Sequence, residues 1–320
     1  MTKLLLVLIL TISIQAQSLL KLHVSKNHTF IAFIESLAQK KYVSTVPRTI
    51  YLSKYKNDLD KFINLHNKVS KSRIKNYKDS NSLLQAFYME SLKTNTFNEL
   101  KNKIKNHNVS IGDKELKRYL NYLSKLYPRF EKILWKKTHR GVLYRKNKLQ
   151  KMMKDKHFDS MVNQILTFYN VKAKDVGIMD VAFYPISYGS RINAYSMGNI
   201  ETIGIFVGRG QNLNWMLSAT ILHELEHTIY RKSKFVKENF LNIKDKKKNR
   251  IINEVFATAI GAGWGYKKLT NKYPTRNWYA NKIYNKYAKL IYPKVKDYLD
   301  NGKKIDKEFV KYIKSFDFKL

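Results

Sequence analysis

The amino-acid sequence predicts an α+β fold, and three observations support that prediction. From Ser18 to about His157, apolar residues recur mainly at the three- and four-residue spacing of helices. Short runs with alternating apolar side chains then occur between Met179 and Val207, as is typical of strands. After Gly210 the helical spacing returns and continues to the end of the chain. A few strands followed by a long run of helices indicate α+β rather than alternating α/β.

The first residues have the features of an export signal. A basic start at Lys3 precedes the apolar run Leu4–Ile14, and Ala16 is a small residue at a plausible cleavage point. The run is shorter than the about 20 residues that span a bilayer. We therefore expect a signal peptide over residues 1–16, with an uncleaved N-terminal anchor as the alternative. The mature protein is expected to be periplasmic or secreted, with no transmembrane segment.

Residues 17–157 are predicted to form a mostly helical N-terminal region. Apolar side chains at helical spacing occur in Phe30–Leu37, Leu83–Leu92 and Leu116–Leu126. The segment Lys136–Lys156 is the most basic of the chain, and we expect it to be a linker or an exposed helix. The histidines of this region are scattered without the spacing of metal ligands. No chemistry is predicted here.

The composition is that of a globular protein with a large positive charge. Hydrophobic residues make up 44% of the chain and the formal net charge is +37. The basic residues are spread along the chain, so a solvated lysine coat is the simpler interpretation. Attraction to an anionic cell-envelope surface is the functional interpretation, and no specific nucleic-acid partner is predicted. The absence of cysteine excludes disulfides, thiolate metal ligands and cysteine nucleophiles.

Residues 158–320 are predicted to form a second domain. A helix over Phe158–Tyr169 is followed by three candidate strands, Met179–Phe183, Arg191–Met197 and Glu201–Val207. The next helix, Leu213–Tyr230, is apolar almost all round, so it should be buried in the domain. Polar side chains on such a helix need partners, because burying them unpaired is costly.

That buried helix contains the pattern H-E-x-x-H in His223-Glu224-Leu225-Glu226-His227. Residues four apart lie on one helical face, so both imidazoles can bind one metal ion while Glu224 leans over the site. Zinc held by two histidines and one carboxylate keeps a position open for water. We expect Glu224 to act as the general base that takes a proton from this water. Glu226 is expected to face away from the metal, either behind its ligands or on the surface.

A third ligand must come from another segment, because no histidine follows the motif. Three acids lie nearby. Glu238 is too close for the chain to leave the first helix and return, and Asp245 lies in a lysine-rich run that should be solvated. Glu254 lies in the apolar, helix-like segment Ile251–Ile260, where a lone carboxylate needs a partner. The sequence therefore predicts a Zn2+ site made by His223, His227 and Glu254.

These residues resemble the gluzincin branch of the zinc metallopeptidases, in which the third ligand is a glutamate on the next helix. The likeness rests on His223-Glu224-x-x-His227 with Asn253-Glu254-x-x-Ala257. Upstream, Asn193–Gly198 and Glu201–Val207 look like the strand that lies along the cleft in that branch. The resemblance covers about Phe158 to Lys267. It implies a zincin-like catalytic domain that hydrolyses peptide bonds of a peptide or protein substrate.

The chain departs from the gluzincin pattern at one position. Many gluzincins have an acid four residues after the glutamate ligand, where it orients the first histidine; here that position is Thr258. The form Glu254–Thr258 instead resembles a bacterial aminopeptidase-like group, and the partner of His223 is left unassigned. A later tyrosine is also implied as stabiliser of the oxyanion. The candidates, with none preferred, are Tyr266, Tyr273 and Tyr279.

Three functions are consistent with these observations. The leading hypothesis is a zinc metallopeptidase with Glu224 as general base. The alternative is a non-catalytic, zinc-stabilised basic module that binds anionic cell-envelope components, which a closed site with four ligands would favour. The sequence offers no obvious fourth ligand. The third is a hydrolase of a different amide, such as a peptidoglycan cross-link.

Overall fold

The computed structural model describes residues 19–38, 61–74, 82–186, 194–207, 214–241, 245–275 and 277–318. The expected signal peptide over residues 1–16 lies outside the described residues. So do the first residues of the second predicted strand, 191–193, and Leu213 at the start of the long predicted helix. Among the helices of the described ranges, none has the length and hydrophobicity that crossing a membrane requires.

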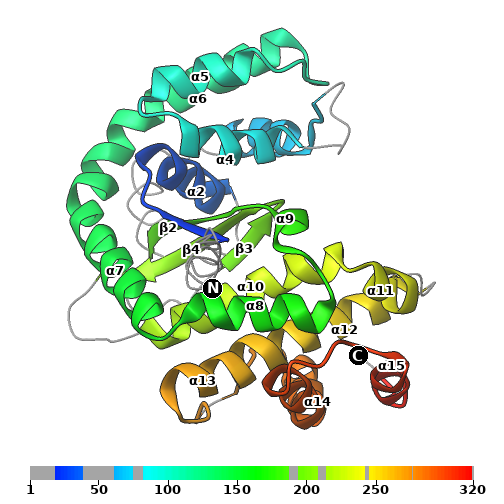
Figure 1. Cartoon of the computed structure of the whole chain (residues 1–320). Coiled ribbons are helices and arrows are strands. Elements are labelled where there is room, and N and C mark those ends of the chain that lie inside the picture. Colours follow the sequence, from blue (N-terminus) through cyan, green and yellow to red (C-terminus); the bar gives the residue numbers. More distant parts are fainter. Residues whose placement is uncertain are drawn as a thin grey trace, which may run out of the picture.

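A four-stranded sheet lies at the centre of the molecule, with strand order β1-β2-β4-β3 (Figure 1). The strands β1 (Leu20–His23), β2 (Met179–Ile186) and β4 (Ile200–Phe206) are parallel. The edge strand β3 (Ala194–Met197) is antiparallel to β4. The expected strands between residues 179 and 207 are therefore present, and the mixture of helices with a small sheet agrees with an α+β class.

Strand β1 lies in the region that was expected to be mostly helical. Its four residues alternate two leucines with Lys21 and His23, which is too short a pattern to distinguish a strand from a loop. The strand forms because it pairs in parallel with β2, far along the chain, with Leu20 opposite Met179. Non-local pairing of this kind leaves no local signal in the sequence.

One face of the sheet is covered by α2, and the helices α4, α5 and α6 lie beyond it (Figure 1). Side chains cap two of these helices, because Ser82 accepts from the amide of Gln85 and Thr96 from that of Glu99. The bounds of the helices are α2 (Lys26–Ala38), a helix over residues 61–71, α4 (Leu83–Lys93), α5 (Phe97–Lys105) and α6 (Asp113–Phe130).

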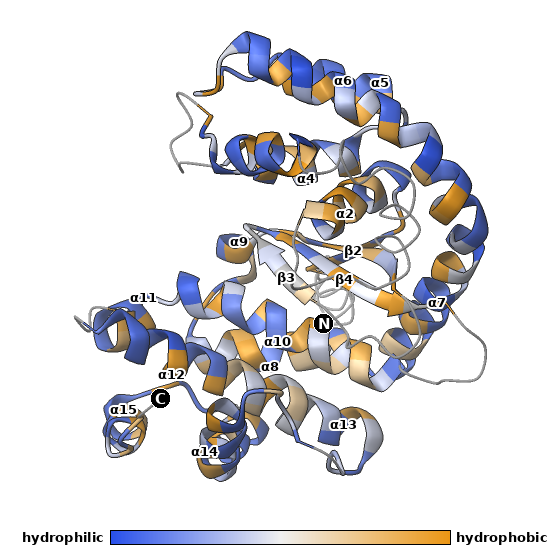
Figure 2. Ribbon diagram, turned by 180° about the vertical axis from the view of Figure 1, so that it is seen from behind, coloured by the Kyte–Doolittle hydropathy of each residue, from blue (hydrophilic) through white to orange (hydrophobic). Residues whose placement is uncertain are grey.

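A long helical arc leads from these helices around the sheet (Figure 1). Pro128 lies near the end of α6, and the backbone then widens into a π-helical turn, η1 (Glu131–Trp135), before α7 (Lys136–Asp155). The basic segment is thus an exposed helix rather than a linker, anchored by Val142, Leu149 and Met153. Figure 2 shows that α6 and α7 are largely hydrophilic, in agreement with a solvated lysine coat.

The other face of the sheet is covered by α8 and α10, with the C-terminal helices packed beneath them (Figure 1). The predicted helices at Phe158–Tyr169, Leu213–Tyr230 and Ile251–Ile260 are present as α8, α10, and α12 with η3. The bounds are α8 (Phe158–Tyr169), α9 (Ala173–Val176), α10 (Asn214–Lys232), α11 (Lys234–Val236), η2 (Lys237–Leu241), α12 (Lys246–Thr258), η3 (Ala259–Gly265), α13 (Tyr266–Thr270), α14 (Lys282–Asp300) and α15 (Lys307–Lys314).

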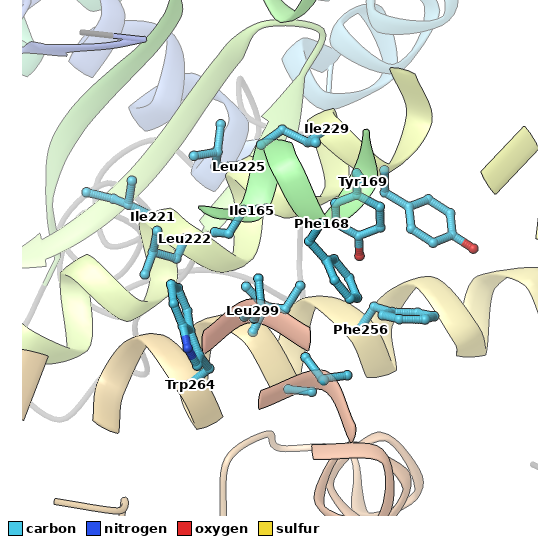
Figure 3. Packing of buried hydrophobic residues seen from close by; sticks show 14 of the residues in the cluster. Ile165, Phe168, Tyr169, Ile221, Leu222, Leu225, Ile229, Phe256, Trp264 and Leu299 are labelled. Atoms are coloured by element: carbon cyan, nitrogen blue, oxygen red, sulfur yellow. The ribbon is translucent and has the colours of Figure 1, made fainter. Parts of the chain in front are cut away.

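Buried apolar side chains form two clusters. The first lies among α2, α4, α5 and α6 and includes Ile200 of β4. The second extends from Val142 to Phe318 and holds the side chains of Figure 3, with Phe168, Leu222 and Trp264 among them. Residues of β1 pack against the second cluster. The domain boundary expected at residue 157, between α7 and α8, remains a prediction.

Candidate metal centre

The three side chains predicted to bind zinc lie together. His223 and His227 are one turn apart on α10, and Glu254 reaches them from α12. The Nε2 atoms of the two histidines are 3.2 Å apart. Oε2 of Glu254 lies 3.7 Å from Nε2 of His223 and 3.9 Å from Nε2 of His227. In a tetrahedral zinc site with bonds of about 2.0–2.2 Å, ligand atoms are about 3.3–3.6 Å apart. The observed spacing is therefore close to that of ligands.

The group is shielded from solvent. The side chains of His223, His227 and Glu254 are 12%, 11% and 19% exposed. Oε2 of Glu254, which faces both imidazoles, is buried and has no hydrogen-bond partner within the described part of the chain. Leaving such an oxygen unpaired costs free energy. A cation shared by the three atoms would satisfy it, so the donor set fits zinc.

Close packing between η3 and α10 brings Glu254 to the histidines. A Cβ atom at Gly261 would lie 2.6 Å from the carbonyl oxygen of Ala219 and 2.8 Å from Cβ of His223. Only glycine allows this approach of the two backbones. Glu254 lies two helical turns before Gly261, so the contact places both on the side that faces α10.

The backbone of Ala257 lies close enough to His223 to act on its imidazole. Burial acts to lower the pKa of His223, but the carboxylates of Glu254 and Glu224 and the backbone of Ala257 raise it overall. Since Nε2 faces the other two ligands, Nδ1 is the atom left for Ala257. Thr258, at the position of the gluzincin acid, is fully buried, and its hydroxyl has no partner among the described residues. The group that acts on His223 here is thus backbone, and not the side chain of Thr258.

The protonation states of His227 and Glu254 are those that a metal ligand needs. Burial, helped by the neighbouring His223, lowers the pKa of His227 to about 3. Burial would raise the pKa of Glu254, but the neighbouring imidazoles of His223 and His227 lower it to about 2. A neutral imidazole and an ionised carboxylate both present lone pairs to a metal ion.

Glu224, the predicted general base, is a buried carboxyl beside this group. Burial is the main cause that raises its pKa, with His223 acting in the opposite direction and Glu254 in the same one. A carboxyl with a raised pKa is better matched to accept and return a proton near neutral pH than a solvated one.

A second buried acid, Glu201 of β4, was not predicted as a site residue. It is fully buried, and neither carboxyl oxygen has a hydrogen-bond partner in the described ranges. Burial raises its pKa well above the ordinary value, and the charge of Glu224 adds to the effect. The signal was present in the sequence, because Glu201 shares strand parity with Ile203 and Ile205, which are buried against α10.

Of the three candidate tyrosines, Tyr279 contacts the group. Its ring stacks on His223, with centroids 5.5 Å apart and planes 15° from parallel. Burial raises the pKa of Tyr279, and the nearby carboxylate of Glu254 adds to the effect. Tyr273 is instead 48% exposed and packs on Tyr292. Tyr266 is the first residue of α13, directly after η3.

Comparisons of the chain with protein-family models, with curated proteins and with solved structures found no match. The interpretation of the site therefore rests on its own residues and their geometry.

Proposed function

We propose that the protein is an exported zinc metallopeptidase of zincin-like fold, of the gluzincin type. The observation that carries the proposal is the spacing of three ligand atoms, from His223, His227 and Glu254, next to the buried carboxyl of Glu224. The placement of the H-E-x-x-H helix beneath a small sheet, with the glutamate on a following helix, supports the zincin-like assignment.

The chain's own residues have distinct roles in this proposal. His223, His227 and Glu254 would hold the zinc ion, which as a Lewis acid polarises a carbonyl and makes water a nucleophile near neutral pH. Glu224 takes a proton from the attacking water and delivers it to the leaving amine as the carbon–nitrogen bond breaks. Tyr279, kept protonated by its raised pKa, can donate a hydrogen bond to the oxyanion.

The test is hydrolysis of a peptide library by purified protein, with metal content measured and with and without chelator. Glu224→Gln is expected to bind zinc like the wild type and to lose about 10²–10⁴-fold in turnover, the usual contribution of general acid–base catalysis. The matched control is Glu238→Gln, at an exposed side chain that pairs with Lys234 four residues earlier. Undiminished turnover in Glu224→Gln would contradict the mechanism.

The non-catalytic alternative, a zinc-stabilised module for anionic envelope components, needs a closed site. In the described part of the chain the group contains three ligand residues, which favours an open position and hence catalysis. Cross-linked peptidoglycan added as a second substrate distinguishes a peptidase from a hydrolase of envelope amides.

A further inference from the structure

Glu226 is fully buried although it lies between the two metal-facing turns of α10. One of its oxygens, Oε1, accepts a hydrogen bond from the hydroxyl of Tyr169. The other, Oε2, is buried without a hydrogen-bond partner among the described residues. Burying an acid in this way costs free energy, so the position calls for a physical reason.

The unpaired oxygen faces the ring of His227. Oε2 of Glu226 lies 3.5 Å from Nδ1 of His227, and that nitrogen also has no hydrogen-bond partner in the described ranges. The distance is a few tenths of an ångström beyond a hydrogen bond. Because Nε2 of His227 faces the other two ligands, Nδ1 is the atom that carries the proton when Nε2 binds a metal. Two unsatisfied buried atoms are thus aimed at each other on the far side of the ligand.

Tyr169 is firmly held at the other end of this chain of contacts. Its backbone carbonyl accepts from the hydroxyl of Ser233 at 2.8 Å. Its buried ring packs edge-on against Phe168, with centroids 4.8 Å apart (Figure 3). It also packs edge-on against Tyr230, with centroids 5.9 Å apart. Tyr169 therefore fixes the Glu226 carboxyl from the hydrophobic core.

We propose that Glu226, held by Tyr169, is the positioning residue of His227: it fixes the Nδ1-protonated tautomer and the ring orientation in which Nε2 binds the metal. This inference rests on the proposed metal site. Carboxylates behind metal-bound histidines commonly have this effect, and their loss costs about 10–100-fold in metal affinity. Here the carboxylate comes from the residue just before the histidine, and its support from α8.

The experiment measures zinc affinity by competition with a chromophoric chelator. We expect Glu226→Gln to weaken zinc binding about 10–100-fold and Tyr169→Phe to weaken it less, because the carboxyl is then present but unanchored. Glu238→Gln is the matched control and should bind as the wild type does. In zinc-loaded wild type, the 15N shifts of His227 should show a protonated Nδ1, which a purely structural role of Glu226 does not require.

Thermal unfolding of the metal-free variants separates binding from folding. If Glu226→Gln does not fold, the zinc affinity of Tyr169→Phe tests the inference, because this variant keeps the acid and removes one hydroxyl. Wild-type affinity in the folded variants, or an Nε2-protonated His227, overturns the inference. Zinc binding that weakens as expected without any hydrolysis supports it while refuting the proposed peptidase. A wild type that binds no zinc overturns both.

Discussion

Two neighbouring residues of β4 point to opposite faces of the sheet and differ in their surroundings. Thr202 faces α2, where its hydroxyl lies 3.0 Å from Nε2 of the buried His28, which is also bonded to Ser91. Glu201 faces α10, and within the described ranges neither of its oxygens has a hydrogen-bond partner. The strand therefore separates a region of paired polar groups from one of unpaired groups.

The difference extends beyond this strand. In the described ranges before residue 200, the buried polar side chains have hydrogen-bond partners, as Asn27 has with Thr94 and His66 with Tyr119. Among the described residues, the buried side-chain atoms without a hydrogen-bond partner all belong to residues after 200. Several of them surround the candidate metal centre. The polar groups over α2 are thus satisfied within the fold, whereas several of those around α10 lack a partner in the described residues, as the proposed metal site would require.

The largest effect on stability is expected where the pairing is complete. Glu35 and Tyr119 are both bonded to the buried His66, so Glu35→Leu leaves that imidazole without its acid. We expect the free energy of unfolding to fall by about 3–5 kcal/mol. Urea denaturation measures this, and zinc affinity of the folded variant should not change. A loss below about 1 kcal/mol would mean that the α2 side is not organised by its polar pairs.

A smaller effect, but one that reaches the metal site, is expected at Gly261. Gly261→Ala introduces a Cβ against the backbone of α10, and overpacking of this kind costs about 1–3 kcal/mol. It should also weaken zinc binding, because Glu254 is moved away from His223. The control is Gly112→Ala, whose new Cβ would meet no atom within 4 Å. Equal zinc affinity in both variants would show that the contact does not position Glu254.

The smallest expected effect, at Glu201, is an increase in stability rather than a loss. Burial raises the pKa of Glu201, so the folded protein keeps a proton that the unfolded chain releases above about pH 4.5. The contribution of this group to stability therefore falls as pH rises from 4.5 toward the raised pKa. Glu201→Gln removes that dependence and should stabilise the metal-free protein at pH 7 by about 1–2 kcal/mol, and less at pH 5. Thermal unfolding at the two pH values tests this, and a destabilised variant at pH 7 would contradict it.

The site was predictable to the extent that its signals are local. The spacing of His223 and His227 and the apolar helix around them can be read in one stretch of sequence. Glu254 required the further step of excluding other acids, and the structure brings it to the histidines. The position of Glu226 was left open between two alternatives, because it depends on Tyr169 on another helix.

The fold was predictable within similar limits. Alternating apolar residues located β2 and β4, whereas β1 forms through a parallel pairing with residues far along the chain. The group that acts on His223 could not be found from residue types, because the backbone of Ala257 supplies it. Contacts made by backbone atoms, or between distant segments, leave no pattern in the sequence.

The helical arc has a consequence for how the molecule unfolds. Its three parts, α6, η1 and α7, have 18, 5 and 20 residues and follow each other without a break. Phe130 at the end of α6 belongs to one hydrophobic cluster and Val142 of α7 to the other. A continuous helix that packs into both clusters couples their stability. If one end of the helix unwinds, the adjoining turns lose backbone hydrogen bonds, and the end that packs in the other cluster is weakened. The two hydrophobic clusters should therefore unfold together, as one cooperative unit, rather than independently.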